Sequence, residues 1–302
     1  MAVRDTAHGE CEAGRAAARR SLDGLSLGDA FGERWFRREP RQASEEVHAR
    51  RTPEEPQWPW TDDTAMALGI LQVLDEHGEI HQPDLALAFA LIHDKDPDRG
   101  YGRGMRALLP RFLHEPERWP ELTRSLFHGE GSLGNGAAMR VAPLGAWFHA
   151  DLPHVVAQAT LSAEVTHAHP EGIAGAVAVA VASALSARRE LALDAVVALT
   201  PASAVRAGLA QASRLSFATE PSRASEILGS GQRYRAEDTV SFAVWSAARH
   251  PDDLVSALWT TAAGLGDVDT TCAITGGIVA ARTGVGGVPK EWLRRREPLP
   301  GG

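Results

Sequence analysis

The chain has 302 residues, of which 44% are hydrophobic, so it is long enough to bury one large core or two small ones. Its formal net charge of −8 excludes the basic footprint that nonspecific nucleic-acid binding requires. Two cysteines are too few for a disulfide framework, and the polar first twenty residues do not read as a signal peptide. The longest apolar stretch, residues 172–187, is shorter than the ~20 residues of a membrane span. We therefore expect a buried helix there, no membrane partner and a cytoplasmic protein.

Apolar residues recur with helical spacing along most of the chain, whereas convincing alternating strand patterns are missing from the sequence. The first predicted helix covers residues 15–28, and a long polar loop with one short helix near 43–50 follows over 37–60. Further helices are predicted at 64–77, 83–93, 105–114, 137–148, 153–165, 171–189, 193–199, 202–217, 239–249, 251–263 and 270–283.

These elements predict an all-α fold, a single compact domain of roughly a dozen orthogonally packed helices. We place this domain at residues 15–288, between a flexible N-terminus at 1–14 and a C-terminal tail at 289–302. The polar residues of interest gather in the loops between the helices, which is where binding residues are commonly found.

Two acidic clusters lie about two hundred residues apart, each just ahead of an apolar helical stretch. They consist of Thr61, Asp62 and Asp63, and of Asp267, Asp269 and Thr270. Carboxylates and hydroxyls are the hard oxygen ligands that Mg²⁺ or Mn²⁺ requires. Helix capping explains one such cluster equally well. Two of them in one chain favour a metal site, because crowded carboxylates need a compensating cation.

A glycine-rich segment at residues 129–136 precedes a predicted helix, so its backbone N–H groups are suited to binding phosphate. A flexible connector is the alternative interpretation of this segment. The segment 166–170 contains His167 and His169, which are candidates for a metal ligand, a phosphate donor or a general acid. A structural histidine at a helix boundary is the more common case.

Five segments in one order resemble the ADP-ribosylglycohydrolases, a family of ADP-ribosyl-acceptor hydrolases. They are residues 28–32, 60–64, 134–140, 166–167 and 266–270, and the loop 98–102 also fits. The resemblance covers residues 15–283, nearly the whole chain. It implies an all-α fold with two Mg²⁺ (or Mn²⁺) ions at the bottom of an ADP-ribose cleft, and therefore a metal-lined cleft.

The resemblance also implies roles for single residues. Thr61, Asp62 and Asp63 would hold one ion, and Asp267, Asp269 and Thr270 the other, with one carboxylate bridging. Asp62, Asp63 and Asp269 would hold the attacking water and accept its proton. Gly100, Gly131, Ser132 and His167 match positions that meet the diphosphate, Leu133 and Asn135 would line the distal ribose, and Phe127 would pack near it. Arg99, Arg140 and His169 remain open between ligand contact and structural role.

The chain departs from the family pattern after Gly32. Relatives often carry a glutamate four residues after this glycine, close to the metals, and here that position is Phe36. The nearest acids are Glu33 and Glu39, and we expect Glu33 to substitute only if the backbone shifts. The polar residue that often separates the two aspartates of the second cluster is Val268 here.

The expected reaction is metal-dependent hydrolysis of the glycosidic bond at C1″ of ADP-ribose, which releases ADP-ribose from an ADP-ribosylated protein or small molecule. One alternative keeps the scaffold but changes the leaving group, for example to a nucleobase or another ADP-ribose-linked small molecule. A second alternative is a protein that binds ADP-ribose without catalysis.

Overall fold

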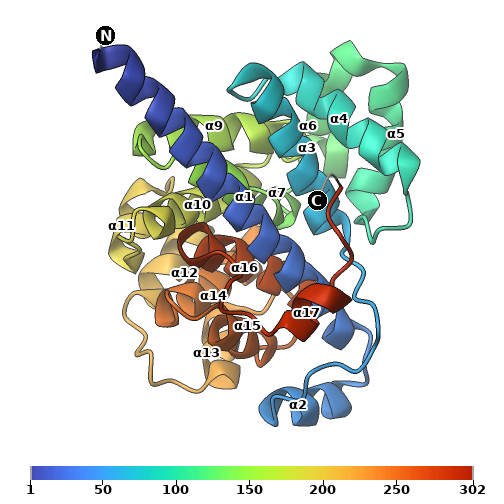
Figure 1. Cartoon of the computed structure of the whole chain (residues 1–302). Coiled ribbons are helices and arrows are strands. Elements are labelled where there is room, and N and C mark those ends of the chain that lie inside the picture. The colour runs from blue at the N-terminus through green and yellow to red at the C-terminus, as the bar shows by residue number, and fades with distance from the viewer. Residues whose placement is uncertain (1, 301–302) are drawn as a thin grey trace.

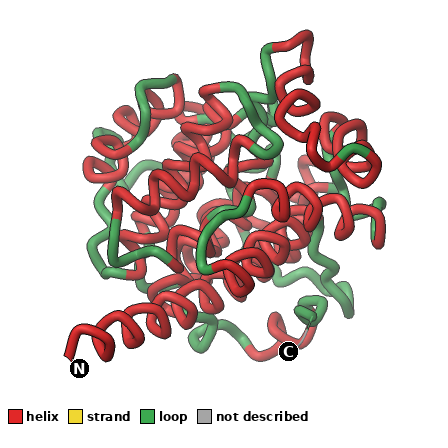
Figure 2. The backbone as a smooth tube through the Cα atoms, turned by 90° about the horizontal axis from the view of Figure 1, so that it is seen from above, coloured by secondary structure: helices red, strands yellow, loops and turns green. Residues whose placement is uncertain are grey.

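The structure is a computed structural model that describes residues 2–300, with side chains described from residue 12 onward. It contains seventeen α-helices and one 3₁₀-helix, and residues 2–300 form no strand (Figure 2). The all-α prediction is therefore confirmed, with more helices than the predicted dozen because several are short.

The helices are α1 (Ala2–Phe36), α2 (Pro40–His48), α3 (Asp62–His77), α4 (Gln82–Lys95), α5 (Arg103–His114), η1 (Pro116–Arg118), α6 (Trp119–Gly129), α7 (Gly136–Met139), α8 (Ala142–Trp147), α9 (Leu152–Glu164), α10 (Pro170–Ala187), α11 (Leu193–Leu199), α12 (Ala204–Ala212), α13 (Pro221–Leu228), α14 (Ala236–Arg249), α15 (Leu254–Ala262), α16 (Val268–Thr283) and α17 (Lys290–Arg295).

The long helix α1 crosses the molecule diagonally, with α3 to α6 on one side of it and α11 to α15 on the other (Figure 1). The apolar helix α10 is long and hydrophobic enough to span a membrane by composition alone, but 78% of it is buried inside the structure. It is therefore placed as a core helix, as its alanine- and valine-rich sequence predicts.

Helices α1 and α16 pack backbone to backbone through glycines. A Cβ added to Gly28 would lie 2.0 Å from the carbonyl oxygen of Cys272, and one added to Gly276 would lie 2.2 Å from that of Gly24. Interiors are close-packed, so the absence of side chains at these positions sets how closely the two helices approach. This contact matters for the site because Asp29 follows Gly28 in α1 and Asp269 lies in the first turn of α16.

Several predicted boundaries differ from the structure. Helix α1 begins earlier and ends later than residues 15–28, and the predicted helix 137–148 is two short helices separated near Val141. Pro143 lies in the first turn of α8, where its missing N–H is tolerated, whereas inside one continuous helix it would interrupt the ladder. Helices α6 and α13, which we did not predict, each have a proline in the first turn and few buried residues.

The segment 289–302, predicted as a tail, contains α17, whose Trp292 is buried against Phe31 with the ring centroids 4.8 Å apart. Trp58, at the end of the polar loop 37–60, joins the same aromatic cluster and pairs with Arg296 through an isolated bridge. Aromatic burial therefore ties both segments to α1. The domain limits at residues 15 and 288 stay predictions.

We expect Gly276→Ala to destabilise the fold by about 1–3 kcal/mol, because the new Cβ overlaps the backbone of α1, which cannot move without shifting the helix. Gly286→Ala is the matched control, since a Cβ there meets nothing within 4 Å. Urea unfolding of both variants measures the difference, and equal stability would contradict the close contact.

Candidate active site

Asp29 anchors the start of α3 against α1. Its fully buried carboxylate accepts hydrogen bonds from the backbone N–H and hydroxyl of Thr61 at 2.9–3.0 Å. It accepts two more from the N–H and hydroxyl of Thr64, at 3.1 and 2.5 Å. Four donors converging on one carboxylate position the first acidic cluster.

The capping interpretation fails for the N-cap residues of both clusters. Thr61 is the N-cap of α3 and makes no side-chain capping bond; its hydroxyl donates to Asp29 at 2.9 Å and lies 3.1 Å from Oδ2 of Asp63. Asp267 is the N-cap of α16 and likewise makes no side-chain capping bond. Thr61 instead bonds Asp29 of α1, and Asp267 accepts a bond from Asn135.

The second cluster is held by residues from three other parts of the chain. Oδ2 of Asp267 accepts a hydrogen bond from Nδ2 of Asn135 at 2.6 Å, and Asn135 also donates to Thr239 at 3.1 Å. The N–H of Asp267 donates to the carbonyl of Ser230 at 3.0 Å. A Cβ on Gly231 would lie 2.5 Å from Cβ of Asp267, so a glycine is needed behind this carboxylate.

The fold brings the two clusters together. Burial raises the pKa of Asp62 to about 8, helped by the negative charges of Asp29 and Asp267. Burial also raises the pKa of Asp63 well above its ordinary value, and the charges of Asp29 and Asp269 add to the shift. The pKa of Asp269 is raised well above its ordinary value by burial and by the charges of Asp267 and Asp29. Asp62 and Asp63 thus sense charges from the second cluster, and Asp29 acts on the carboxylates of both clusters.

Two oxygen atoms in this group have no hydrogen-bond partner. They are Oδ1 of Asp63 and Oδ1 of Asp269, both buried, and neither accepts a bond from any described residue. A buried, unpartnered carboxylate oxygen is costly unless a proton or a cation compensates it. Crowded oxygen ligands with orphaned acceptors fit Mg²⁺ or Mn²⁺, the hard divalent cations that take such donors.

His167 is a neutral hydrogen-bonding group beside the glycine-rich loop. Burial, with a smaller contribution from the charge of Arg140, lowers the pKa of His167 to about 3. The Thr166 hydroxyl accepts from Arg140 at 2.8 Å and lies 2.7 Å from Nδ1 of His167. We assign this hydroxyl as the donor to Nδ1, which leaves the ring proton on Nε2. Nε2 lies beside Gly134 and Gly136, within 3.5 Å of an added Cβ.

Among the other predicted ligand contacts, Gly100 lies beside a carboxylate, whereas Gly131, Ser132 and Leu133 make contacts within and around the glycine-rich loop. Gly100 has φ +95°, and a Cβ added to it would lie 3.3 Å from Oδ1 of Asp62. Gly131, at φ +76°, packs against the N–H of His169, where a side chain would clash. The Ser132 hydroxyl accepts the N–H of Gly134 at 3.2 Å. The carbonyl of Leu133, which is partly buried, accepts the N–H of Ala236.

Phe127 is half exposed and has a strained backbone. Its φ is +53°, and His128 follows at +64°, in a left-handed region that residues with a Cβ rarely occupy. The ring lies against Gly104 of α5, 3.3 Å from an added Cβ. The kink places an aromatic side chain at the entrance to the glycine-rich loop.

The three residues that the sequence left open all have structural partners. His169 caps α10 by accepting the N–H of Glu171 at Nδ1. Arg140 is fully buried, stacks on Phe89 at 4.3 Å and donates to Thr166. Arg99 belongs to a network behind the site that is described below.

Glu33, not Glu39, lies toward the carboxylates. Its side chain is only 6% exposed, and its charge raises the pKa of Asp269. Glu39 instead caps the exposed end of α2. Residues three apart share a helix face, so Glu33 lies one turn before Phe36 on the same face. Helix α1 is continuous through both positions, and the expectation that Glu33 substitutes for the family glutamate only if the backbone shifts stays a prediction.

Two further residues at this site escaped the sequence analysis. Tyr234 is 56% exposed, and its pKa is raised by partial burial and by the charges of Asp267 and Asp269. Arg106 is an exposed residue of α5 whose positive charge lowers the pKa of Asp62. The glycines at positions 229 and 231 could have indicated a turn before Tyr234, whereas no local sequence pattern connects Arg106 with the aspartates.

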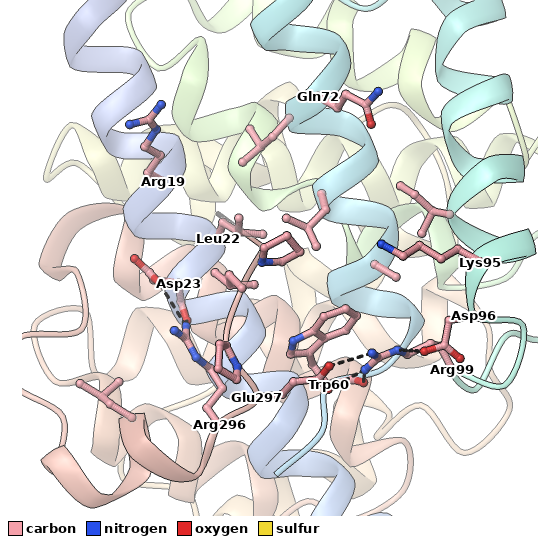
Figure 3. A pocket seen from close by; sticks show the side chains of 18 of the residues that line it. Arg19, Leu22, Asp23, Trp60, Gln72, Lys95, Asp96, Arg99, Arg296 and Glu297 are labelled. Carbon is pink, nitrogen blue, oxygen red and sulfur yellow. Dashed lines mark hydrogen bonds and ion pairs between the residues drawn. The ribbon is translucent and has the colours of Figure 1, made fainter. Parts of the chain in front are cut away.

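A large cavity lies behind α3, and it is not at the carboxylates. Its volume is about 1140 Å³, and its lining includes Trp60 and Arg99 but none of the six proposed metal ligands. In Figure 3, Arg99 lies over Trp60, 3.7 Å from the ring centroid, and pairs with Glu297 and Asp96. The carbonyl of Arg99 accepts the N–H of Asp62 at 2.7 Å. The C-terminal segment thus braces the back of the first cluster, and the predicted metal-lined cleft stays a prediction.

The fold is all-α, and two carboxylate clusters converge beside a glycine-rich loop. These features define a class of helical protein that combines oxygen ligands with a loop suited to an anionic ligand. The sequence profile of the ADP-ribosylglycohydrolases matches residues 11–300. The chain therefore belongs to the ADP-ribosylglycohydrolase family.

Individual relatives agree with this assignment. ADP-ribosylhydrolase ARH3 of Homo sapiens is 40% identical over 132 residues, which are 43% of this chain and 36% of that protein. The match thus spans about a third of the length of this relative. ADP-ribosyl-[dinitrogen reductase] glycohydrolase of Rhodospirillum rubrum is 30% identical over 240 residues, or 78% of this chain and 72% of that one. A solved ADP-ribosylglycohydrolase-related protein complex shares the fold, with a TM-score of 0.66 and 24% identity over 95% of this chain and 94% of that chain.

In the absence of divalent cations, we expect the protein to lose stability as pH rises from about 4 to about 8. The folded state raises the pKa of Asp29 and Asp267 to about 6 and that of Asp62 to about 8, from 3.8. The folded state therefore binds more protons than the unfolded state in this window, and stability falls with pH. Thermal unfolding in chelator should show a shallower slope for Asp62→Asn, and Mg²⁺ should restore wild-type stability at pH 8. Equal slopes for the two proteins would contradict the shift.

We expect Glu33→Gln to weaken Mg²⁺-dependent thermal stabilisation by about 10–100-fold in apparent affinity, the range found for residues that support metal ligands. Glu39→Gln is the control, because Glu39 lies at an exposed helix end. Mg²⁺ titrations followed by thermal unfolding compare the two, and unchanged affinity in the Glu33 variant would exclude it from the site.

Proposed function

We propose that this protein is a metal-dependent hydrolase that cleaves the glycosidic bond at C1″ of ADP-ribose and releases ADP-ribose from an acceptor. The observation that carries the proposal is the convergence of five buried or half-buried aspartates, Asp29, Asp62, Asp63, Asp267 and Asp269, with two orphaned oxygen atoms. Family membership and the names of the relatives support ADP-ribose as the ligand.

The residues that would hold two Mg²⁺ (or Mn²⁺) ions are Thr61, Asp62 and Asp63 for one, and Asp267, Asp269 and Thr270 for the other. When bound, such ions polarise substrate oxygens and lower the pKa of water. Asn135 supports this arrangement by fixing the orientation of the Asp267 carboxylate.

The remaining residues orient the substrate. Backbone N–H groups at Gly100 and Ser132, together with Nε2–H of His167, are suited to the diphosphate, because neutral donors bind an anion without a competing proton equilibrium. The N–H of Gly131 donates to the carbonyl of Leu126 at 3.0 Å, so Gly131 would meet the diphosphate through its Cα. Leu133 and Asn135 line the distal ribose in this proposal, with Phe127 at the entrance.

The aspartates supply the base. Asp62, Asp63 and Asp269 hold the attacking water and accept its proton as the water oxygen bonds to C1″. The bond from C1″ to the acceptor breaks through an oxocarbenium-like transition state, and the proton taken by the aspartates passes to the departing acceptor atom. The acceptor is an ADP-ribosylated protein or small molecule. An atypical leaving group remains a rival, because Phe36 and Glu33 rearrange the region where relatives carry a glutamate.

A protein that binds ADP-ribose without catalysis is the second rival. All six proposed ligands are present. Thr61 and Asp267 are held by hydrogen bonds, and Asp62 and Thr270 are buried without an unpartnered oxygen. Selection for binding alone does not require such a crowded group of acids, which is unfavourable without a cation.

We expect Asp62→Ala and Asp269→Ala, made separately, to lower hydrolysis at least about a hundredfold, because each removes a ligand and a proton acceptor. Asp194→Ala is the matched control, since Asp194 is also an acid in the first turn of a helix but lies exposed on α11. Release of ADP-ribose from arginine-, serine- and small-molecule-linked substrates is the measurement. Wild-type turnover in both variants would refute the site, and Mg²⁺-dependent ADP-ribose binding without turnover on any linkage would favour the non-catalytic rival.

A further inference from the structure

A second group of potential metal ligands lies at the opposite end of α3. His77 ends α3, His81 is the N-cap residue of α4, and Asp84 lies in the first turn of α4. Nε2 of His77 and Nδ1 of His81 lie 2.8 and 2.9 Å from the same carboxylate oxygen of Asp84. The three ligand atoms are all within 4.8 Å of one another.

The turn that carries His81 is anchored on both sides. The N–H of Ile80 donates to Oε1 of Gln158 in α9 at 2.7 Å, and this bond is buried. The side chain of Gln82 donates to the carbonyl of Leu161 at 3.0 Å. The residues on either side of His81 are therefore both tied to α9, one through its backbone and one through its side chain, which limits the order that the turn has to gain when His81 binds a ligand.

Helix dipoles account for only part of this arrangement. A histidine at the end of α3 and an acid at the start of α4 are each favourable near their helix termini. That explanation needs one histidine and one acid, and it does not require both rings to face a single oxygen. The ring centroids of His77 and His81 lie 5.1 Å apart, and each ring presents a nitrogen to the same carboxylate oxygen of Asp84.

We propose that His77, His81 and Asp84 form a site for Zn²⁺ or a similar borderline divalent cation, with water completing the coordination. Two imidazoles and one carboxylate form a ligand set that suits Zn²⁺, whereas Mg²⁺ prefers all-oxygen sites. Tetrahedral Zn²⁺ with bonds of 2.0–2.1 Å needs ligand atoms about 3.4 Å apart. The present spacing has to open by about half an ångström, which these partly exposed side chains allow.

The site is separate from the carboxylate clusters and independent of the proposed function. Asp62 and His77 are at opposite ends of α3, about 22 Å apart at 1.5 Å per residue. A bound ion would cross-link the end of α3 to the start of α4. The protein would thus hold two chemically distinct kinds of ion, one at each end of α3.

The test is calorimetric titration of tag-free, metal-stripped protein with Zn²⁺ in excess Mg²⁺, which keeps the oxygen ligands occupied. We expect wild type to bind one Zn²⁺ equivalent that His77→Ala and His81→Ala each weaken at least tenfold. His114→Ala is the matched control, because His114 also ends a helix, α5, but belongs to no group of three potential ligands among the described residues. Asp84→Asn preserves the side-chain shape and should weaken binding as well.

Spectroscopy and stability complete the test. Co²⁺ in place of Zn²⁺ should give visible d–d bands in wild type and in His114→Ala but not in the His77 and His81 variants. Saturating Zn²⁺ should raise the unfolding temperature of wild type and of His114→Ala, but not that of the His77→Ala and His81→Ala variants. Equal Zn²⁺ affinity in wild type and the His77→Ala and His81→Ala variants, or no binding at all, would overturn the proposal. ADP-ribose hydrolysis by His81→Ala should equal that of wild type, so failure of this site and failure of the hydrolase proposal are distinguishable.

Discussion

The buried carboxylate of Asp29 is the constraint on which the rest of the site depends. It lies on α1 next to Gly28, at the point where α1 and α16 touch backbone to backbone. Four donors from Thr61 and Thr64 bind it, and these donors begin α3. The three helices that carry acids are thereby joined at one place. A change in the distance between α1 and α16 would therefore also move the two acidic clusters relative to each other.

This arrangement is electrostatically unfavourable by itself. Burial and mutual repulsion raise the pKa of Asp62, Asp63 and Asp269, and two carboxylate oxygens lack partners. Neutral hydrogen-bond donors from the surrounding structure, such as Asn135 at Asp267, stabilise some of these carboxylates. Crowded, buried acids of this kind need either protons or a cation to offset their mutual repulsion, and the cost of bringing them together is met when the protein folds.

Support also comes from the far side of α3. Arg99 stacks on Trp60, pairs with Glu297 and, through its carbonyl, holds the N–H of Asp62. The C-terminal segment thus contacts the loop that includes Gly100, beside Asp62. Large aromatic side chains, including Trp58 and Trp292, bury this segment against α1. The large cavity next to this network is lined by none of the six proposed metal ligands.

Much of this protein could be predicted from local patterns in the sequence. Helical periodicity predicts the long helices α3, α4, α10 and α16 nearly to their ends, because burial on one or all faces leaves a repeat that can be read locally. The paired acids with hydroxyls and the glycine segments likewise indicate oxygen chemistry and phosphate binding from residue type alone. Short helices such as α6 and α13 were missed, because a few turns bury too few residues to show a period.

Only the tertiary structure decided which of these residues meet. Glu33 faces Asp269 while Glu39 caps a surface helix, a difference set by the direction in which α1 packs on α16. Tyr234 and Arg106 approach the aspartates from distant segments, and Arg99, His169 and Arg140 turned out to be structural supports. The sequence by itself determined the helical class and the kinds of ligand atom available. The juxtaposition of those atoms depends on long-range packing, in which contacts between residues two hundred positions apart leave no local trace.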